Sequence, residues 1–260
     1  MRLVSWNIHG GVGQDGRQDL SRIAALLRES GCDAAALQEV GDPWRPPVPG
    51  GPGQVADQAA VIGRELGWYV AYGPNFAIAG RPYGNAIVSR FPIARAKNYD
   101  LSVPGREPRG CLRADLTLPG GRSLHFFNLH LGLSAGERRR QTEMLLSADL
   151  LRDTALHAPL VVCGDFNMWW PAPGPIARLL RTTLRDAASV ARSKRPTWPS
   201  GFPLLRLDRA YVDSAVRVVA CGVVNDPRSR NASDHLPLWL EVDIVPEAVA
   251  SALAAQEAGA

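Results

Sequence analysis

Short apolar runs that end in a carboxylate, an amide or an imidazole recur along the whole chain. An apolar run of this length, bounded by polar and turn-forming residues, is typical of a buried β-strand. Because similar polar residues stand at an end of each run, we expect those ends to converge on one site. The residues are Asn7 in SWNIHG, Glu39 in LQEV, His130 in FNLHL, Asp165 and Asn167 in CGDFN, Asp208 in LDRAYV, and Asp234 with His235 in SDHLPL.

Strands outnumber helices in the predicted fold. Helical periodicity covers Leu20 to Arg28 and Val55 to Leu66, and a capping box of Ser134 with Glu137 starts a helix that continues to Leu151. Hairpins and longer crossovers favour two packed, mostly antiparallel sheets with helices outside, which is an α/β sandwich. The predicted strands are Arg2 to Ile8, Ala34 to Gln38, Trp68 to Tyr72, Asn85 to Ser89, Cys111 to Leu118, Ser123 to Leu129, Leu160 to Cys163, Leu207 to Val212, Val216 to Val223 and Leu236 to Val242.

The composition favours a single domain. The chain has 260 residues, 46% of them hydrophobic, which is enough for one large core, and no low-complexity linker divides it. We therefore expect one domain over residues 1–245 and an alanine-rich tail over residues 246–260 that forms a frayed helix or is disordered. The Pro/Gly-rich stretch Asp42 to Gly53 is expected to be a surface loop.

Arginine supplies nearly all of the positive charge. The formal net charge is +4, and Lys97 and Lys194 are the only lysines. This balance suits an anionic partner such as a phosphorylated substrate, but it is equally that of an ordinary, mildly basic protein. The run Arg138-Arg139-Arg140 is predicted to be a solvated helix face.

The cysteines and the apolar segments bear on location. The 4 cysteines are far apart in the sequence and are predicted to be reduced core residues. The chain shows no basic leader and no apolar run of membrane-spanning length, so we expect a cytoplasmic protein without integral membrane association. A mature secreted form would have the same appearance.

Glu39 is a hard oxygen ligand at the tip of a predicted strand. Asn7 is able to contribute an amide oxygen or to orient the carboxylate, and Asp234 would complete the site. This donor set favours Mg²⁺ or Mn²⁺ over zinc. Taken alone, Glu39 would be a surface glutamate after a strand, and only the accompanying motifs favour the metal site.

The other polar residues suit the hydrolysis of a phosphate ester, which requires an activated water and donors to the charge that builds in the transition state. Asp165 is predicted to orient or deprotonate the water, and Asn167 to donate to a phosphoryl oxygen. A lone Asp-x-Asn would more often be an Asx-turn that ends a strand. His235 is the most plausible base, with Asp208 holding its imidazole. His130 is predicted to donate to the phosphate.

Four further residues are predicted to contact the substrate. Arg106 lies in the loop segment Arg106-Glu107-Pro108-Arg109, whose two arginines are suited to clamp a phosphate. The equal alternative is that both arginines are solvated. Tyr83 and Asn85 offer a hydroxyl and an amide at the mouth of the cleft. Trp198 is an aromatic side chain that would hold a base, a sugar or a lipid, with anchoring of the loop as an equal alternative.

The ordered set SWNIHG, LQEV, GNAIVS, NLHL, GDFN, LDRAYV and SDHLPL resembles the endonuclease/exonuclease/phosphatase superfamily over residues 3 to about 242. That superfamily includes type I deoxyribonucleases, apurinic/apyrimidinic endonucleases, inositol polyphosphate phosphatases, neutral sphingomyelinases and tyrosyl-DNA phosphodiesterases. The resemblance implies a four-layered α/β sandwich. It also implies that Glu39 is the principal metal ligand, with Asn7 and Asp234 nearby.

The same resemblance implies roles for the remaining motif residues. Asp208 and His235 look like the base dyad, Asp165 and Asn167 like the water-orienting and phosphate-binding pair, His130 like the phosphate-contacting histidine, and Arg106-Glu107-Pro108 like a phosphate-contacting segment of the deoxyribonucleases.

Departures from the pattern disfavour some members of the superfamily. His9 stands where the abasic-site enzymes usually carry an aspartate, and Met168 to Arg181 replaces their lysine- and asparagine-bearing segment. An abasic-site role is therefore disfavoured. The cysteines do not match the disulfides of the secreted deoxyribonucleases, and no long apolar hairpin supports a lipid-surface enzyme.

The sequence thus predicts a monomeric phosphoester hydrolase that depends on Mg²⁺ or Mn²⁺, with nuclease activity as the first choice and nucleic acid as a possible partner. The alternatives are a phosphatase or a sphingomyelinase-like lipid head-group phosphodiesterase and, from another class, a catalytically silent binding module. The last is disfavoured because no catalytic residue is missing. The scissile bond does not follow from the sequence, since loops select the substrate on a shared fold.

Overall fold

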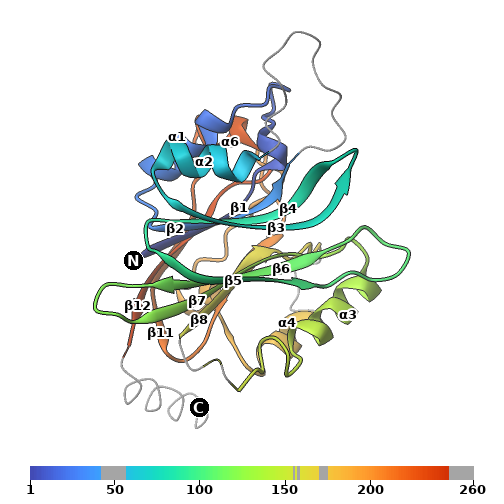
Figure 1. Cartoon of the computed structure of the whole chain (residues 1–260), viewed down its shortest axis with the longest axis vertical. Coiled ribbons are helices and arrows are strands. Elements are labelled where there is room, and N and C mark those ends of the chain that lie inside the picture. Colours follow the sequence, from blue (N-terminus) through green and yellow to red (C-terminus); the bar gives the residue numbers. More distant parts are fainter. Residues whose placement is uncertain (42–56, 155, 157–158, 170–174, 246–260) are drawn as a thin grey trace.

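The computed structural model describes residues 1–41, 57–154, 156, 159–169 and 175–245. Two six-stranded sheets pack face to face, and helices cover the outer face of each sheet (Figure 1). The predicted four-layered α/β sandwich is therefore confirmed.

The first sheet has a parallel pair, β1 and β2, near its centre. Its other strand pairs are antiparallel. In spatial order its strands are β11 (Val216–Val223), β12 (Leu238–Ile244), β1 (Arg2–Asn7), β2 (Ala34–Val40), β4 (Arg81–Ser89) and β3 (Tyr69–Ile78).

The second sheet repeats this arrangement, with β7 and β8 as its parallel pair. Its remaining pairs are antiparallel, as predicted for most of the fold. In spatial order its strands are β5 (Ile93–Asp100), β6 (Gly110–Thr117), β7 (Ser123–His130), β8 (Leu160–Asp165), β10 (Asp208–Val212) and β9 (Arg185–Asp186).

Helices form the two outer layers. The longest of them begin at side-chain caps: Asp19, Asp57 and Ser134 each accept a hydrogen bond from the backbone three residues on. Helices α1, α2 and α6 lie over the first sheet, and α3 and α4 lie over the second (Figure 1). The bounds of all helical segments, including the short η1 and α5 that are not part of these layers, are η1 (His9–Gly11), α1 (Leu20–Glu29), α2 (Gln58–Leu66), α3 (Ala135–Leu145), α4 (Pro175–Leu180), α5 (Ala187–Val190) and α6 (Pro227–Ala232).

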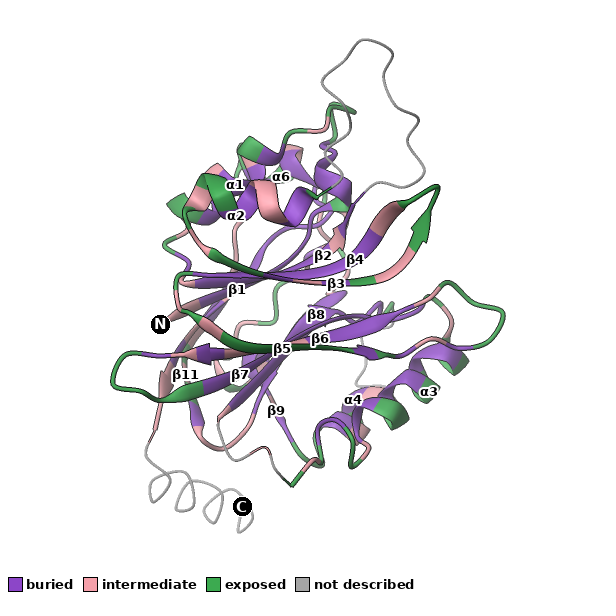
Figure 2. Ribbon diagram, in the orientation of Figure 1, coloured by how far each residue is buried: buried purple, intermediate pink, exposed green. Residues whose placement is uncertain are grey.

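A small polar network is buried in the otherwise apolar layer between the sheets, which Figure 2 shows as the most buried part of the fold. Nδ2 of Asn128, on β7, donates to the carbonyls of Leu37 and Ala86 on the opposite sheet, both at 2.8 Å. Nε2 of Gln38 donates to Oδ1 of Asn128 at 2.6 Å. Because buried polar groups are costly without partners, these directional bonds fix the position of one sheet on the other.

Every predicted strand is present, and the differences from prediction have local causes. Strand β5, with the sequence IARAKNYD, was not predicted because it is a polar edge strand whose side chains are mostly exposed. The helix that begins after Ser134 ends at Leu145 rather than at Leu151. Arg138 is buried, not solvated, because its Nη1 donates to the carbonyl of Gly132 at 3.3 Å. The predicted loop Asp42 to Gly53 and the predicted tail lie outside the described residues.

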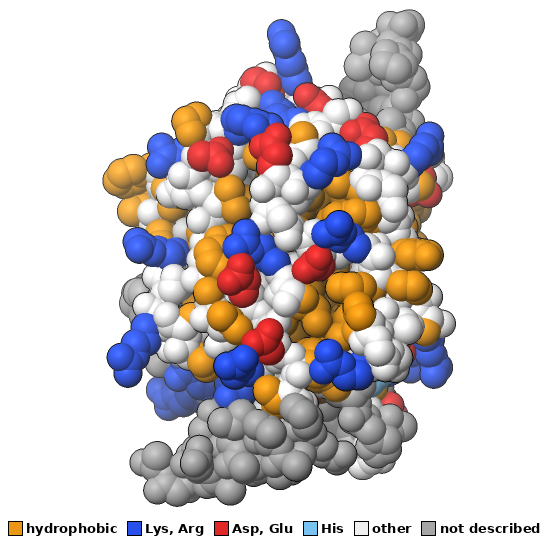
Figure 3. Space-filling model, turned by 90° about the vertical axis from the view of Figure 1, so that its left-hand side faces the viewer, with side chains coloured by type: hydrophobic (Ala, Val, Ile, Leu, Met, Phe, Trp, Pro, Cys, Tyr) orange, Lys and Arg blue, Asp and Glu red, His pale blue; other side chains and the backbone are white. Residues whose placement is uncertain are grey.

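Figure 3 shows the side of the molecule on which β1 begins. Basic and acidic side chains are interspersed there, with apolar side chains between them. Asn7 and Glu39 lie at the other, carboxyl-terminal ends of β1 and β2, so the site described below belongs to the other side of the sandwich.

Candidate active site

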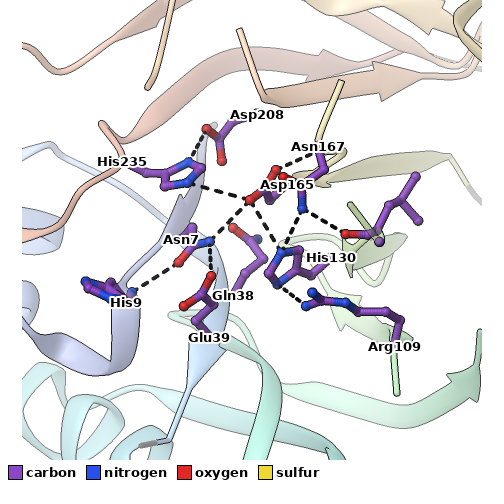
Figure 4. Close-up of polar contacts among 12 residues, drawn as sticks. Asn7, His9, Gln38, Glu39, Arg109, His130, Asp165, Asn167, Asp208 and His235 are labelled. Atoms are coloured by element: carbon purple, nitrogen blue, oxygen red, sulfur yellow. Dashed lines mark hydrogen bonds and ion pairs between the residues drawn. The ribbon is translucent and has the colours of Figure 1, made fainter. Parts of the chain in front are cut away.

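The two parallel strand pairs bring four predicted residues to one edge of the sandwich. Asn7, His130 and Asp165 are the last residues of β1, β7 and β8, and Glu39 is the last but one of β2. Strands of a parallel pair run in the same direction, so their carboxyl ends meet at one edge. In Figure 4 these side chains point toward one another.

His235 and Asp208 form a dyad that joins the two sheets. Asp208 begins β10 in the second sheet, whereas His235 precedes β12 in the first. Nδ1 of His235 lies 2.9 Å from Oδ2 of Asp208, and the two side chains are only 6% and 0% exposed. Because a carboxylate only accepts, Nδ1 carries a proton, and Nε2 faces the remainder of the site.

Oδ2 of Asp165 is the point on which the site converges. Nδ2 of Asn7 donates to it at 3.2 Å, Nε2 of His130 lies 3.5 Å from it, and Nε2 of His235 lies 3.7 Å from it. The other oxygen, Oδ1, accepts from the backbone N–H of Asn167 at 2.9 Å. A carboxylate and two imidazoles therefore border one small volume.

The tautomer of His130 follows from its neighbours. Nη1 of Arg109, which only donates, lies 3.0 Å from Nδ1 of His130. Nδ1 must then accept, so the proton of the neutral ring is on Nε2, which faces Asp165. Nδ2 of Asn167, which also only donates, lies 3.1 Å from this nitrogen, so with the proton on Nε2 the two do not hydrogen-bond to each other; Nδ2 donates instead to the carbonyl of Leu131 at 2.8 Å. His130 and Asn167 thus present N–H groups to the same volume.

Several backbone positions at the site are in the left-handed region, which side chains other than glycine rarely adopt. His9, Glu39 and Asn167 have φ values of 50°, 55° and 49°. Such conformations are typical of functional sites, where the surrounding fold holds them in place. Gly164, just before Asp165, has a φ of 149° and lies against the carbonyl of Leu129.

Burial and neighbouring charges shift the pKa values of the site. Burial lowers the pKa of His235, but the charges of Asp208 and Asp165 outweigh it and raise this pKa to about 10. Burial raises the pKa of the Asp165 carboxyl to about 6, against the opposing effect of His235. Burial, Arg109 and His235 together hold the pKa of His130 well below its usual value, so this ring is neutral.

The donor set around Glu39 suits a hard divalent cation. Glu39 is partly exposed, and its Oε1 accepts from Nδ2 of Asn7 at 2.8 Å. Asn7 Oδ1 accepts from the backbone N–H of His9 at 3.1 Å, so Asn7 orients the carboxylate. The buried hydroxyl of Tyr83 also bonds to Glu39. Asp234, 35% exposed, lies beside His9 at the same edge.

Within the described residues, no three His, Cys, Asp or Glu side chains form a ready-made metal cage. Mg²⁺ seldom needs one, because it keeps several waters and takes one or two carboxylates together with substrate phosphate oxygens. Glu39 and Asp234 fit that description, whereas zinc sites are usually built from several histidine or cysteine ligands.

The four predicted substrate contacts have different positions. Arg106 is exposed in the loop after β5, and it is Arg109, three residues on, that reaches His130. Asn85 is buried and ties the sheets together, with its Nδ2 donating to the carbonyl of Gly110 at 2.9 Å. Tyr83 lies against Glu39, as described above. Trp198 packs edge-on against Trp169, with the ring centroids 5.1 Å apart.

Residues that hold the candidate site residues in position were not identified from the sequence. Ser233 Oγ donates to the carbonyl of Asn7 at 2.7 Å, and Nε1 of Trp6 donates to the carbonyl of His235 at 2.9 Å. Thr197 Oγ1 accepts from the backbone N–H of Asp208 at 3.3 Å. Serine, threonine and tryptophan are common in cores and turns, so only the motif SDHLPL, which contains Ser233, gave a signal.

The arrangement has a match among known protein families. Residues 4–235 match the profile of the Endonuclease/Exonuclease/phosphatase family. The chain belongs to this family. The match includes every motif residue named above, from Asn7 to His235. Proteins of the endonuclease/exonuclease/phosphatase family are generally phosphoester hydrolases, so the coarse prediction of a hydrolase of this kind is confirmed.

Relatives and solved structures of the endonuclease/exonuclease/phosphatase family agree with the fold. The protein YbhP of Escherichia coli K12 is 37% identical over 179 residues, which are 67% of this chain and 68% of YbhP. A family member from Beutenbergia cavernae superposes with a TM-score of 0.77 at 23% identity, covering 94% of this chain and 72% of that one.

Two further solved structures have names that state an activity or a ligand. A mannosyl-6-phosphatase from Bacteroides thetaiotaomicron superposes with a TM-score of 0.76 at 18% identity, covering 94% of this chain and 100% of that one. TDP2 of D. rerio, complexed with a single-stranded DNA product, superposes with a TM-score of 0.65 at 17% identity, covering 94% of this chain and 98% of that one. At these identities the likeness concerns the fold. No helix of the described residues is long and apolar enough to cross a membrane.

Proposed function

We propose that the protein is a divalent-metal-dependent phosphodiesterase and that nucleic acid is the first substrate to test. The observation that carries the proposal is the convergence on Asp165 Oδ2, where Asn7, His130 and His235 lie within 3.2–3.7 Å. A buried carboxylate between two imidazoles, with a second carboxylate behind one of them, suits the activation of water.

The dyad would prepare the attacking water. Asp208 holds Nδ1 of His235, so Nε2 is the nitrogen that exchanges a proton with the water. A water that bonds to both Nε2 of His235 and Oδ2 of Asp165 would be oriented by two groups 3.7 Å apart. Losing such a base typically lowers the rate by about 10²–10⁴-fold.

The opposite wall of the site would stabilise the charge that develops on phosphorus. His130 presents its Nε2 proton, and Asn167 presents its amide, to the position of a non-bridging oxygen. Arg109 supports His130 from behind; its guanidinium is only 6% exposed and pairs on its other side with Glu107 at 3.1 Å. Preorganised donors in a buried site contribute more to catalysis than the same groups in water.

Glu39 and Asp234 would hold the cation, with Asn7 and Tyr83 orienting Glu39. The cation would neutralise phosphate oxygens and lower the pKa values of the water and of His235. Mg²⁺ and Mn²⁺ are the ions that such a set of oxygen ligands favours.

A phosphomonoesterase is the second candidate. It is favoured by the fold likeness to a mannosyl-6-phosphatase, whereas the phosphodiesterase is favoured by the likeness to TDP2 bound to a DNA product. The catalytic groups serve either reaction, so only substrates separate the two. A nuclease should also lose affinity steeply with added salt, because each phosphate contact releases counterions.

The test is hydrolysis of plasmid DNA, structured RNA, bis(p-nitrophenyl) phosphate and p-nitrophenyl phosphate, each with Mg²⁺, Mn²⁺ or chelator. The variants are Glu39→Gln and His235→Asn. We expect metal-dependent turnover of the diesters and a loss of at least about 100-fold in each variant. Preference for the monoester would replace the phosphodiesterase with the phosphatase, and absence of turnover on every substrate would count against both.

The chain offers a matched control for the dyad. His125 pairs with Asp115 at 2.6 Å on the outer face of the second sheet, away from the convergence point. His125→Asn removes an imidazole from a histidine–aspartate pair without touching the proposed site, and it should keep activity. Equal losses in His125→Asn and His235→Asn would mean that the effect of His235 is structural.

A further inference from the structure

A pocket distinct from the proposed active site lies at the β9–β10 edge of the second sheet, with a volume of about 260 Å³. Met168, Trp169 and Leu204 contribute apolar walls, and the charged lining residues are Arg181, Asp186, Lys194, Arg206 and Arg209. Four of these five charged side chains are basic. The pocket is thus strongly positive, in a chain whose net charge is only +4.

The single carboxylate is already committed to one arginine. Asp186 is 1% exposed, and its two oxygens accept from Nη1 and Nη2 of Arg206 at 2.9 and 2.6 Å. This bidentate pair neutralises Arg206. Arg181 and Arg209 approach the same carboxylate only at 3.8 and 3.9 Å.

Arg209 therefore lacks an anion of its own. Its side chain is 9% exposed, and its Nε has no hydrogen-bond partner among the described residues. Its other polar neighbour, the hydroxyl of Tyr211, is uncharged because burial raises the pKa of that phenol. A buried charge that only shares a distant carboxylate is poorly compensated, so an added anion in this pocket would be favourable.

The pocket is the immediate neighbour of the proposed active site. Met168 and Trp169 follow Asn167 directly, and Arg209 follows Asp208 on β10. Successive residues of a strand point to opposite faces, so β10 presents Asp208 to the catalytic groups and Arg209 to the pocket. Trp169, 38% exposed, lines the pocket and packs against Trp198. To reach the pocket, a substrate held in the active site would have to extend past Trp169 and around the start of β10.

We propose that this basic pocket binds a second phosphate of the substrate, one that is not cleaved, while Trp169 contacts the group that links the two phosphates. Guanidinium groups bind phosphate bidentately, and an aromatic edge suits a sugar or base. The assignment of this phosphate to a substrate rests on the proposed function, whereas the existence of the anion site does not.

Binding is tested first, without catalysis. Inorganic phosphate is added to the metal-free protein in chelator, and the melting temperature is followed, since a ligand of the folded state raises it. The variant R181Q/K194Q removes the two more accessible charges and spares the buried pair. The control R95Q/K97Q removes the same charge from β5, at the opposite edge of the same sheet. We expect the rise in wild type and control, and its loss in R181Q/K194Q.

Catalysis is tested with two chromogenic esters that share one scissile bond. They are thymidine 5′-(p-nitrophenyl phosphate) and the same compound with a 3′-phosphate. We expect the extra phosphate to raise kcat/KM by about 10- to 100-fold in wild type and in the control, as charged hydrogen bonds do, and hardly at all in R181Q/K194Q. Glycerophosphoinositol and its 4-phosphate form a second pair, which distinguishes a lipid head group from a nucleotide as the source.

The outcomes separate the two proposals. If phosphate does not raise the melting temperature of the wild type, or raises it equally in R181Q/K194Q, the pocket is not an anion site. Stabilisation that R181Q/K194Q loses, without turnover of any ester, supports the anion site and refutes the hydrolase. If R181Q/K194Q loses the same factor in kcat/KM on the ester with the extra phosphate and on the ester without it, the pocket does not bind a second phosphate.

Discussion

Gly164 offers a sharp test of how the fold positions Asp165. With a φ of 149°, it occupies a conformation that other residues rarely adopt. A Cβ on Gly164 would lie 1.9 Å from the carbonyl oxygen of Leu129, whereas real Cβ contacts stay beyond 3.0 Å. In Gly164→Ala, β7 and β8 must therefore move apart by about 1 Å at that point in this close-packed interior.

The cost has two parts. Backbone strain of this kind amounts to about 1–3 kcal/mol, and overpacking adds about 1–3 kcal/mol. Because the next residue is Asp165, a displacement of about 1 Å should also lower kcat by about 100-fold on any substrate that the wild type cleaves. The loss of stability is measured by urea unfolding, and the loss of rate by phosphodiester hydrolysis under conditions where the variant is folded.

Gly120→Ala is the matched control. Gly120 has a φ of 80°, but a Cβ there would meet nothing within 4 Å. It should show strain of about 1 kcal/mol and unchanged activity. If Gly164→Ala unfolds at the same urea concentration as the wild type and keeps its kcat, the close approach of β7 and β8 does not position Asp165, and the reasoning fails.

Three other perturbations have defined outcomes. Asp208→Asn should lower kcat by about 10²–10⁴-fold while circular dichroism stays native, and a rate within threefold of wild type would remove Asp208 from the dyad. Arg109→Gln should lower kcat/KM by about 10- to 100-fold, because a charged donor within the site is lost, whereas Arg106→Gln should not; the reverse order would restore the prediction made for Arg106. Asp186→Asn leaves Arg206 unpaired and should cost about 3–5 kcal/mol of unfolding free energy at pH 7. Burial raises the pKa of the Asp186 carboxyl, but Arg206 and Arg209 outweigh it and hold this pKa below its ordinary value of 3.8. The stabilisation that ionised Asp186 gives to the folded protein is therefore fully present above about pH 4. It is lost as the pH falls through the pKa of the folded state. The gap between wild type and variant in urea midpoint should therefore narrow below about pH 4, and a constant gap would contradict the assignment.

The sequence was sufficient where period and polarity agreed. Buried strands such as Ala34–Val40 and Leu160–Asp165 are continuous apolar runs with polar ends, so both the strand and the polar residue near its end were recognisable. Strand β5 was missed because solvent faces most of its side chains, so it has no apolar run to mark it.

The same limit applies to the site. Arg106 and Arg109 are equivalent in sequence, and only the pairing of β6 with β7 places Arg109 beside His130. Likewise, the role of Asn7 depends on which neighbour its amide meets in three dimensions. Single-sequence patterns give the inventory of a site, whereas tertiary contacts assign the partners.

The buried network of Asn128 and Gln38 has a consequence for which substitutions the protein tolerates. The proposed dyad takes His235 from one sheet and Asp208 from the other, so the proposed activity would depend on the alignment of two layers whose contacts are mostly apolar and therefore not directional. Substitutions deep in that layer, far from any reacting atom, should therefore appear in an activity screen before they appear in a screen for expression.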